Sequence, residues 1–387
     1  MVKAIKVMLI PNNVQETKMF EYAGASRFAY NWALAREKEN YEKGGRFILD
    51  SELRKEFTKL RHSDEYAWLL NISNNVTKQA IKDACNAYKN FFKGLKKIPR
   101  FKSRKKSMPK FYQDNVKIQF SNTHVKLEGF SSSRKANKQK LNWVRLAEHG
   151  RISTDAKYMN PRISFDGLNW WISVCVEFPD CKEILNDDGV GIDLGIKDLA
   201  VCSDAVKYKN INKSQKVKKL EKQKRRLQRS ISRSYEKNKK GESYCKTNNV
   251  IKKEKLLLKR NHRLTNIRKN YLNQTISEIV NRKPRFICIE YLNVSGMMKN
   301  RHLSKVVQEQ GFFLFRKQLE YKCSDKGIQL IVADRFYPSS KLCCCCGNIK
   351  KDLKLSDRIY RCECGNMIDR DFQASKNLKT YGEKFAS

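Results

Sequence analysis

The chain has 387 residues and carries 81 Lys and Arg against 40 Asp and Glu, which gives a formal net charge of +41 and a pI near 9.8. This excess of positive charge is larger than solubility requires. It predicts a polyanionic partner, with nucleic acid favoured over a membrane surface. No apolar run approaches the roughly 20 residues of a membrane-spanning helix, and the Lys-interrupted start Met1–Ile10 does not read as a signal peptide. The length allows two or three domains.

The N-terminal part predicts one strand followed by helices. Lys3–Ile10 alternates like a strand and is ended by Pro11. Apolar residues then recur at helical spacing over 14–41, 51–62 and 76–92, so we expect residues 12–92 to form an all-helical insertion.

A basic segment follows at Lys93–Lys110, with nine Lys or Arg and no acid. Aromatic residues flank or interrupt it, namely Phe91, Phe92, Phe101, Phe111 and Tyr112. Basic side chains interleaved with aromatic rings can pair with phosphates and stack on bases. A solvated, flexible linker has the same composition, so both interpretations stay open.

Residues 116–178 have a strand-like pattern. Arg162–Phe165, the turn Asp166-Gly167 and Trp170–Val176 predict a β-hairpin. We assign Trp170 and Trp171 to packing rather than to base stacking. The run 186–189 marks a domain boundary.

The C-terminal half predicts an α/β sheet, because short apolar strands at 190–194, 286–290 and 329–333 alternate with helical stretches that include 306–325. Between the first two strands, residues 207–269 hold 24 Lys or Arg against four Glu and have the spacing of a helical hairpin with its turn at 238–249. Such a hairpin could simply be solvated, but the shortage of acids favours a phosphate-facing surface.

Three acids lie where a metal site would need them. Asp193 ends the first strand, Glu290 ends the second and Asp371 opens the final helix. Acids at strand ends and at a helix start can converge at one edge of a sheet, and Mg²⁺ pairs that cleave phosphodiesters need such oxygen ligands. Each acid alone is weak evidence, since a turn or an ion pair explains it equally well. Asp198, Asp204 and Asp369 compete nearby, and Asp369 is expected to pair with Arg370 or to cap the helix.

Cysteines cluster just before the last acid. The run Cys343–Cys346 ends in Gly347, and the pair Cys362 and Cys364 ends in Gly365. Two thiolate pairs, each followed by glycine, predict a zinc ribbon in a reducing compartment rather than disulfides. The second pair is Cys-x-Cys and the first has two extra thiols, so the ligand register of the first pair stays open.

These motifs resemble those of the TnpB (OrfB) family, transposon-encoded RNA-guided nucleases related to type V CRISPR effectors. The stretches that carry the resemblance are Phe28–Leu34, Pro99–Ser103, Val190–Ala200, Ile289–Val294, Phe336–Lys341 and Asp369–Asp371. Gln373 departs from the family, which usually has Asn at that position.

The resemblance implies a fold that combines α/β and β parts. A β-barrel (wedge) domain would comprise residues 1–11 and 107–185, with a helical recognition insertion at 12–106. An RNase H-like RuvC nuclease domain would comprise 186–338 and 367–387, with a basic helical hairpin at 212–282. A zinc ribbon that binds target nucleic acid would be inserted at 339–366.

The resemblance also implies the site residues. Asp193, Glu290 and Asp371 would be the catalytic ligands of two Mg²⁺ ions. The ligands of one structural Zn²⁺ would be Cys343, Cys346, Cys362 and Cys364. The basic side chains expected to contact nucleic acid are Lys96, Lys97, Arg100, Lys102, Arg104, Lys105, Lys224, Arg225, Arg226 and Arg229.

The implied function is RNA-guided cleavage of double-stranded DNA beside a short adjacent motif, at one Mg²⁺-dependent RuvC site. The expected partners are a guide RNA and target double-stranded DNA, with no membrane and with a monomer in the ribonucleoprotein, at the nucleoid of a bacterial cytoplasm. Alternatives are a non-cleaving RNA-guided DNA-binding regulator, a strand-transferring transposase and a compact type V CRISPR effector. A plain zinc-ribbon binding protein would leave the three carboxylates unexplained.

Overall fold

A computed structural model describes residues 2–130, 141–179, 183–354 and 357–386. The chain divides into two compact units, Met1–Pro179 and Asp180–Ser387, so the division falls several residues before the boundary predicted at 186–189. Among the described residues, no helix is both long enough and apolar enough to cross a membrane.

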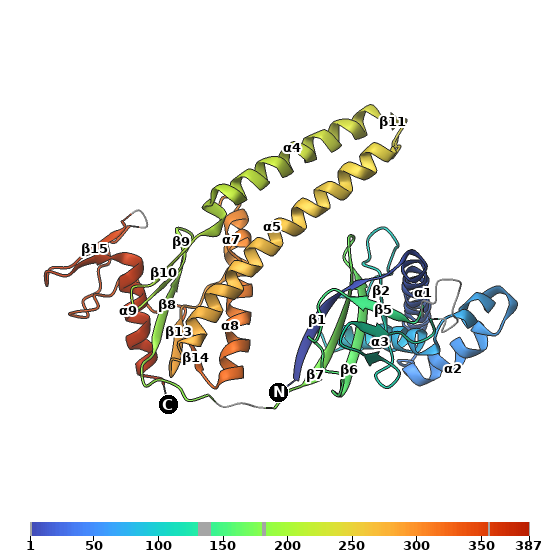
Figure 1. The fold of residues 1–387 in the computed structure, drawn as a ribbon. Coiled ribbons are helices and arrows are strands. Elements are labelled where there is room, and N and C mark those ends of the chain that lie inside the picture. The colour runs from blue at the N-terminus through green and yellow to red at the C-terminus, as the bar shows by residue number, and fades with distance from the viewer. Residues whose placement is uncertain (1, 131–140, 180–182, 355–356, 387) are drawn as a thin grey trace. The chain divides into compact units, whose positions relative to one another are not determined.

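The first unit contains a seven-stranded antiparallel sheet in the order β2-β6-β7-β1-β5-β4-β3 (Figure 1). Its strands are β1 (Val2–Ile10), β2 (Lys110–Tyr112), β3 (Gln119–Phe120), β4 (His124–Lys126), β5 (Trp143–Leu146), β6 (Tyr158–Phe165) and β7 (Trp170–Glu177). The closed barrel expected here is not seen in the described residues, because the outer strands β2 and β3 are not paired with each other.

The predicted hairpin is confirmed. Phe165 in β6 pairs with Trp170 in β7, and Gly167 in the turn has a φ of 93°. The Asp166 carboxylate accepts hydrogen bonds from the backbone N–H groups of Leu168 and Asn169, which closes the turn. Trp170 is 1% exposed and belongs to the core, as predicted.

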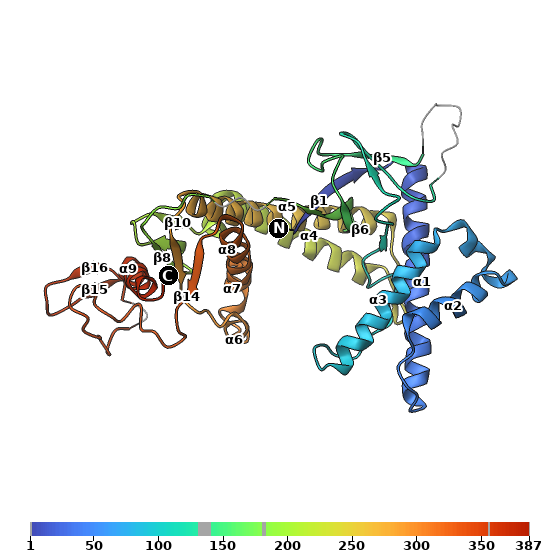
Figure 2. The same cartoon turned by 90° about the horizontal axis from the view of Figure 1, so that it is seen from below.

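Helices cover this sheet, as Figures 1 and 2 show. They are α1 (Asn13–Glu42), α2 (Asp50–Arg61), the 3₁₀ helix η1 (Asp64–Asn71) and α3 (Asn74–Phe92), within two residues of the predicted bounds for the three α-helices. Helix α1 starts with a capping box, in which the Asn12 side chain accepts from the Gln15 N–H and the Gln15 side chain accepts from the Asn12 N–H. One apolar core joins the sheet and these helices.

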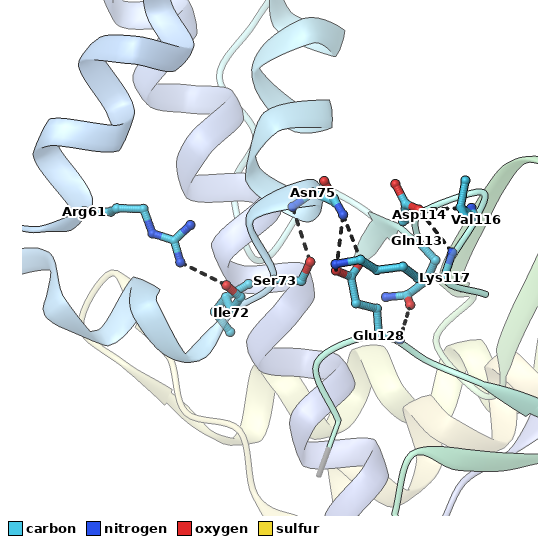
Figure 3. A network of polar contacts seen from close by, with 9 residues as sticks. All are labelled: Arg61, Ile72, Ser73, Asn75, Gln113, Asp114, Val116, Lys117 and Glu128. Carbon is cyan, nitrogen blue, oxygen red and sulfur yellow. Dashed lines mark hydrogen bonds and ion pairs between the residues drawn. The ribbon is translucent and has the colours of Figure 1, made fainter. Parts of the chain in front are cut away.

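A polar network ties the start of α3 to the sheet (Figure 3). The Asn75 amide donates to both carboxylate oxygens of Glu128, at 3.2 and 3.1 Å. Lys117 Nζ lies 2.7 Å from Glu128 Oε1, and the Glu128 backbone N–H donates to Gln113 Oε1 at 2.7 Å. Since Asn75 and Glu128 are 53 residues apart in the sequence, their contact fixes the helical segment on the sheet.

The basic segment 93–110 is held against α1. The Asn31 side chain donates to the carbonyl of Lys102 and accepts from its N–H, both at 2.8 Å. Lys102 is half-buried, and its ammonium lies over the Tyr30 ring. The segment is therefore anchored at its centre, unlike a flexible linker.

The second unit is built on a five-stranded sheet in the order β10-β9-β8-β13-β14. Strands β8, β13 and β14 are parallel, and β9 and β10 extend the sheet antiparallel. The strands are β8 (Val190–Leu194), β9 (Asp198–Cys202), β10 (Lys207–Lys209), β13 (Phe286–Ile289) and β14 (Gln329–Val332). The three predicted strands are thus present in an α/β sheet.

Each face of this sheet buries alternate side chains. Ile192, Ile287 and Ile289 pack with apolar residues of α5 (Asn248–Asn281) and α8 (Phe312–Lys326). Phe286 and Cys288, on the opposite face, pack with Leu378 of α9 (Arg370–Glu383). The central sheet is therefore a middle layer between two helical layers, as Figure 1 shows.

The basic hairpin consists of α4 (Gln215–Lys237) and α5, which extends well beyond the sheet (Figure 1). The predicted turn contains a small ladder of β11 (Lys239–Lys240) and β12 (Ser243–Tyr244). A short 3₁₀ helix, η2 (Ile211–Lys213), precedes α4.

The helix predicted at 306–325 is wrong in one respect. Gly311 has a φ of 71° and divides it into α7 (Ser304–Gln310) and α8. A left-handed residue cannot continue an α-helix, and glycine tolerates this conformation without strain. The remaining elements are α6 (Val294–Met297) and the ribbon strands β15 (Ile359–Arg361) and β16 (Met367–Asp369).

Candidate carboxylate and cysteine sites

Glycines let α9 lie directly on the sheet. A Cβ atom on Gly191 of β8 would lie 2.1 Å from the Ser375 carbonyl oxygen and 2.3 Å from the Lys379 backbone nitrogen. A Cβ on Gly382 would lie 2.3 Å from the Phe286 ring. Side chains at these positions would push α9 away, so the glycines set the distance between the helix and the strands.

This packing brings the three predicted acids to one end of the sheet. Ile192 and Ile289 are register partners on parallel strands, so Asp193 and Glu290 follow them at adjacent strand ends. Both acids continue the face that contacts α9, because side chains alternate along a strand. The step from Gly191 to Asp193 along β8 and the step from Ser375 back to Asp371 along α9 each cover about 6 to 7 Å. Asp371 therefore comes level with Asp193, just as Ser375 lies level with Gly191.

The electrostatics agree with this convergence. Burial, together with the negative charges of Glu290 and Asp371, holds the pKa of Asp193 well above its usual range. Burial and the charge of Asp371 raise the pKa of Glu290 to about 7. Like charges that lie close together disfavour one another's ionisation, and a bound cation would reverse that effect. The three carboxylates thus offer the all-oxygen ligand set that Mg²⁺ prefers.

Two of the three competing acids, Asp369 and Asp204, are engaged elsewhere. Asp369 is the N-cap of α9, where Oδ1 accepts from the backbone N–H groups of Asp371 and Phe372, each at 3.1 Å. Burial opposes its ionisation, but the Phe372 hydrogen bond and Lys207 hold the pKa of Asp369 below its usual value. Asp204 forms an ion pair with Arg282. The helix-capping role predicted for Asp369 is confirmed.

Four cysteines form the second cluster. The Sγ atoms of Cys343, Cys346, Cys362 and Cys364 all lie within 4.8 Å of one another. Two of the separations are 3.6 Å, between Cys343 and Cys364, and 3.5 Å, between Cys346 and Cys362. A tetrahedron with Zn–S bonds of about 2.3 Å has edges of about 3.8 Å, so these two separations are near the expected value and the four sulfurs lie close enough together to share one zinc ion.

Two tight turns with similar backbone hydrogen bonds present these sulfurs. In the first, the N–H of Cys343 donates to Asn348 O and the N–H of Gly347 donates to Cys343 O. In the second, the N–H of Cys362 donates to Asn366 O and the N–H of Gly365 donates to Cys362 O. Gly347 and Gly365 have φ values of 74° and 88°, so both turns need glycine. The second turn is one residue shorter, because its Gly365–Cys362 hydrogen bond spans three residues where the Gly347–Cys343 bond spans four.

The thiols also interact strongly with one another. Burial opposes ionisation of Cys343, but the N–H groups of Cys346 and Cys345 lower the pKa of its thiol to about 6. The pKa of Cys346 rises to about 12, because the thiols of Cys362 and Cys364 outweigh a hydrogen bond from the Asn348 backbone. A cation at the centre would offset the repulsion between thiolates.

Sequence reasoning missed a polar network that joins this ribbon to α9. Gln373 Nε2 donates to the Leu342 carbonyl at 2.8 Å, and Gln373 Oε1 accepts from the Asn366 amide at 2.9 Å. The Asn377 amide donates to the carbonyls of Ser339 and Leu342, each at 2.7 Å. The Cys344 thiol lies 3.7 Å from Gln373 Oε1 and outside the four-sulfur cluster. The only hint in the sequence was the spacing of the two amide residues, Gln373 and Asn377, four positions apart in the final helix.

Most of the predicted basic residues are on the surface. Lys102 and Lys224 are half-buried, and the exposed members are Lys96, Lys97, Arg100, Arg104, Lys105, Arg225, Arg226 and Arg229. At the base of the basic hairpin, Arg225, Arg226 and Arg229 line a pocket of about 580 Å³ that also includes Lys222 and Lys305. Arg268 braces this pocket through Asn212 at 2.7 Å and Glu221 at 3.1 Å.

Comparisons with known proteins agree with this geometry. A family described as a probable transposase matches residues 173–301, and a Cas12f1-like TNB domain matches 312–378. A family described as a helix-turn-helix domain matches residues 1–46, where the structure has strand β1 and helix α1.

Two relatives match almost the whole chain. “Putative RNA-guided DNA endonuclease InsQ” of Escherichia coli K12 is 30% identical over 398 residues, which cover 98% of this chain and 92% of the relative. A Streptomyces pristinaespiralis protein of similar name is 28% identical and covers 98% of this chain and 89% of its own length. Among solved structures, the Cas12f1–sgRNA–target DNA complex aligns with a TM-score of 0.61 at 12% identity, covering 98% of each chain.

The sheet, its two helical layers and the likeness to Cas12f1 define a RuvC-containing mixed α/β fold. The matches over nearly the full length go further. The chain belongs to the TnpB (OrfB) family.

Proposed function

We propose that this protein is an RNA-guided DNA endonuclease that hydrolyses target DNA beside a short adjacent motif. The observation that carries the proposal is the convergence of Asp193, Glu290 and Asp371 at one sheet edge, in a chain whose relatives are named for this activity. A non-cleaving regulator would not need three mutually repelling, partly buried acids. Their repulsion destabilises the metal-free site.

The residues divide the catalytic work as follows. Asp193 and Glu290 would be two of the metal ligands, held in place at the ends of adjacent strands. Asp371 would complete the set from the first turn of α9. Two Mg²⁺ ions bound there would activate a water and stabilise the leaving oxygen. Asp369 holds the start of α9, and so the Asp371 side chain, through its two cap hydrogen bonds. Because the described residues offer one such carboxylate site, both DNA strands would be cut in turn.

The cysteine cluster is assigned a structural Zn²⁺, with Cys343, Cys346, Cys362 and Cys364 as its ligands. The proximity of the four sulfurs to one another supports this assignment. Gln373 and Asn377 would transmit the ribbon's position to α9. Residues 339–366 would then form the insertion that contacts target nucleic acid.

The remaining assignments follow the two units. Residues 1–11 and 107–185 would be the wedge domain and 12–106 the recognition insertion, while 186–338 and 367–387 would be the nuclease domain. Guide RNA and target double-stranded DNA would contact the basic segment 93–110 and the hairpin 212–282. In both segments Lys and Arg far outnumber Asp and Glu, which favours contact with phosphates. We assign one protein chain to each ribonucleoprotein.

Sequencing the RNA that co-purifies with the protein tests the proposal. The purified complex is then incubated with Mg²⁺ and with plasmid libraries that carry the matching target beside randomised flanks. We expect cleavage only of matched targets with one flanking motif. Guided binding without cleavage would instead indicate a regulator, and absence of bound RNA would contradict RNA guidance.

A further inference from the structure

A groove on the first unit contains an unexplained glycine. One side of the groove is α1, the opposite side is the segment 104–109, and the β6–β7 turn contributes the floor. Its volume is about 800 Å³, within the roughly 300 to 1,000 Å³ range of sites that bury a small ligand. Gly24 lies in the middle of the α1 wall.

Gly24 has no structural reason to be glycine. Its φ is not positive, and a Cβ atom built on it would meet nothing within 4 Å. Glycine in a helix interior is about 1 kcal/mol less favourable than alanine. Gly24 differs in this respect from Gly191, where a Cβ atom would collide with α9. The open space above Gly24 therefore suits a ligand that approaches the helix backbone closely.

An exposed aromatic ring lies one turn before this glycine. Phe20 is 42% exposed, although its ring contacts the edges of Phe165 and Trp170, with centroid distances of 5.2 and 4.9 Å. The two contacts hold the ring in one orientation and leave part of it in the groove. A ring held in this way is a stacking platform for a nucleic acid base.

The cations around the groove are available to an anion. Arg27 lies on the next turn of α1, and Arg104, Lys105 and Lys106 face it from the opposite wall. Within the described residues, none of these four side chains forms an ion pair. The two acids of the groove are already engaged: Glu21 pairs with Lys18 at 2.9 Å, and Asp166 closes the hairpin turn and accepts from the Trp171 indole.

The opposite wall is ordered rather than loose. Ser107 N–H donates to the Ser103 carbonyl at 2.9 Å, and the two serine side chains accept further backbone hydrogen bonds within the same turn. Asn31 anchors the adjoining Lys102 backbone to α1. The cations of 104–106 are thus presented at a fixed place along α1.

We propose that this groove binds an unpaired segment of the guide RNA, with one base stacked on Phe20 and the backbone crossing Gly24 between Arg27 and Arg104–Lys106. Guide RNA is favoured because bases in a duplex cannot reach a protein ring, whereas RNA loops and ends offer splayed bases for stacking. The inference rests on the proposed function, since it assigns that function's guide to a place on the first unit.

The test uses the full-length protein freed of nucleic acid and the RNA that co-purifies with it, isolated and labelled. Gly24→Ala should raise the unfolding midpoint of the first unit by about 2 to 4 °C, from helix propensity, yet weaken RNA binding at least threefold. Tryptophan fluorescence follows this unit alone, because all five tryptophans lie in it. Phe20→Leu should weaken RNA binding about fivefold or more, the loss of one stacked base.

Arg27→Gln and Arg36→Gln form a matched pair on α1. Arg36 already pairs with Glu39 and Glu56, whereas Arg27 has no acidic partner in the described residues. Arg27→Gln should reduce the salt dependence of RNA binding by about one phosphate contact, and Arg36→Gln should leave it unchanged. A nuclease footprint should lose protection at one RNA segment in Gly24→Ala and Phe20→Leu.

Wild-type RNA affinity and footprint in both Gly24→Ala and Phe20→Leu would overturn the groove assignment alone, while guided cleavage by the wild type still upheld the proposed function. Unchanged RNA binding with weaker binding of single-stranded DNA would overturn RNA as the occupant. A wild-type protein that binds no RNA would overturn the proposed function itself.

Discussion

The second unit holds two clusters of potential metal-ligating side chains, which are assembled in opposite ways. The four cysteines come from two turns within a segment of 22 residues, 343–364, and each turn is closed by its own glycine and backbone hydrogen bonds. The three carboxylates come from two strands and a helix spread over about half of the chain, and core packing aligns them. The cysteine site should therefore depend on its metal for folding, whereas the carboxylate site should depend on the fold for its geometry.

The largest effect should come from losing a carboxylate ligand. Glu290→Gln and Asp371→Asn should each reduce guided DNA cleavage by about 10³-fold or more, the scale of losing one transition-state-stabilising group. Zinc content and RNA binding should stay at wild-type values, because the fold does not need these charges. Asp369→Ala should be milder, since Asp369 acts through the start of α9. Single-turnover cleavage rates measure all three variants, and equal losses for Asp369 and Asp371 would contradict the division of roles.

Removing one of the proposed zinc ligands should unfold the cysteine site. Elemental analysis should find about one zinc per wild-type chain and nearly none in Cys364→Ser, because structural zinc sites of this kind fold only with their metal. Cleavage should fall about 10- to 100-fold, the range for losing a group that orients a metal site, through the Gln373 and Asn377 contacts to α9. Cys344→Ser is the matched control and should keep its zinc. If Cys344→Ser loses zinc while Cys343→Ser keeps it, the register of the first turn is wrong.

A substitution that moves α9 but leaves all three carboxylates in the sequence should show how far the carboxylate site depends on packing. Gly191→Ala puts a methyl group 2.1 Å from the Ser375 carbonyl, so α9 must shift. We expect a loss of about 1 to 3 kcal/mol in stability and a clear loss of cleavage, although no ligand has changed. Circular dichroism and cleavage rates measure the two effects. The same substitution at Gly24 should stabilise the protein, and an unchanged stability in Gly191→Ala would show that α9 does not lie on β8 as described.

At Glu37, in contrast to the carboxylate site, burial raises the pKa of the carboxyl without repulsion from neighbouring acids. Its side chain is 2% exposed, and burial raises the pKa of its carboxyl to about 7, against opposing contributions from the Ile48 N–H, Cys85 and Lys89. The folded state then holds a proton more tightly than the unfolded state. Stability should therefore be fully present below about pH 4.5 and should fall as pH rises toward 7, by up to about 3 kcal/mol. Glu37→Gln should lack this decrease.

Urea unfolding followed by tryptophan fluorescence measures that difference between pH 5 and pH 8. Wild-type and Glu37→Gln curves with the same pH dependence would contradict the buried, protonated state of Glu37.

The sequence was sufficient wherever the signal is local. The short apolar runs at 190–194 and 286–290, the Asp166-Gly167 turn and the paired cysteines with their glycines were each predicted correctly. Gly311 was missed because apolar spacing continues through it, and only the backbone reveals its left-handed conformation.

Features that depend on distant contacts were not predictable from single motifs. The bonds from Gln373 to Leu342 and Asn366 need the ribbon and α9 in place. The open space above Gly24 is visible only once the neighbours of α1 are known. The barrel expected by resemblance is an open sheet in the described residues, since strand order and closure follow from tertiary pairing.

Strand-resolved cleavage by Asp193→Ala tests the central claim most directly. A guided duplex labelled on both strands is incubated with the wild-type and variant ribonucleoproteins in Mg²⁺, and binding to the same duplex is measured in parallel. Since we propose that one carboxylate site serves both strands, cleavage of the two strands should disappear together while guided binding is retained. Cleavage of either strand at the wild-type rate would contradict the single-site account.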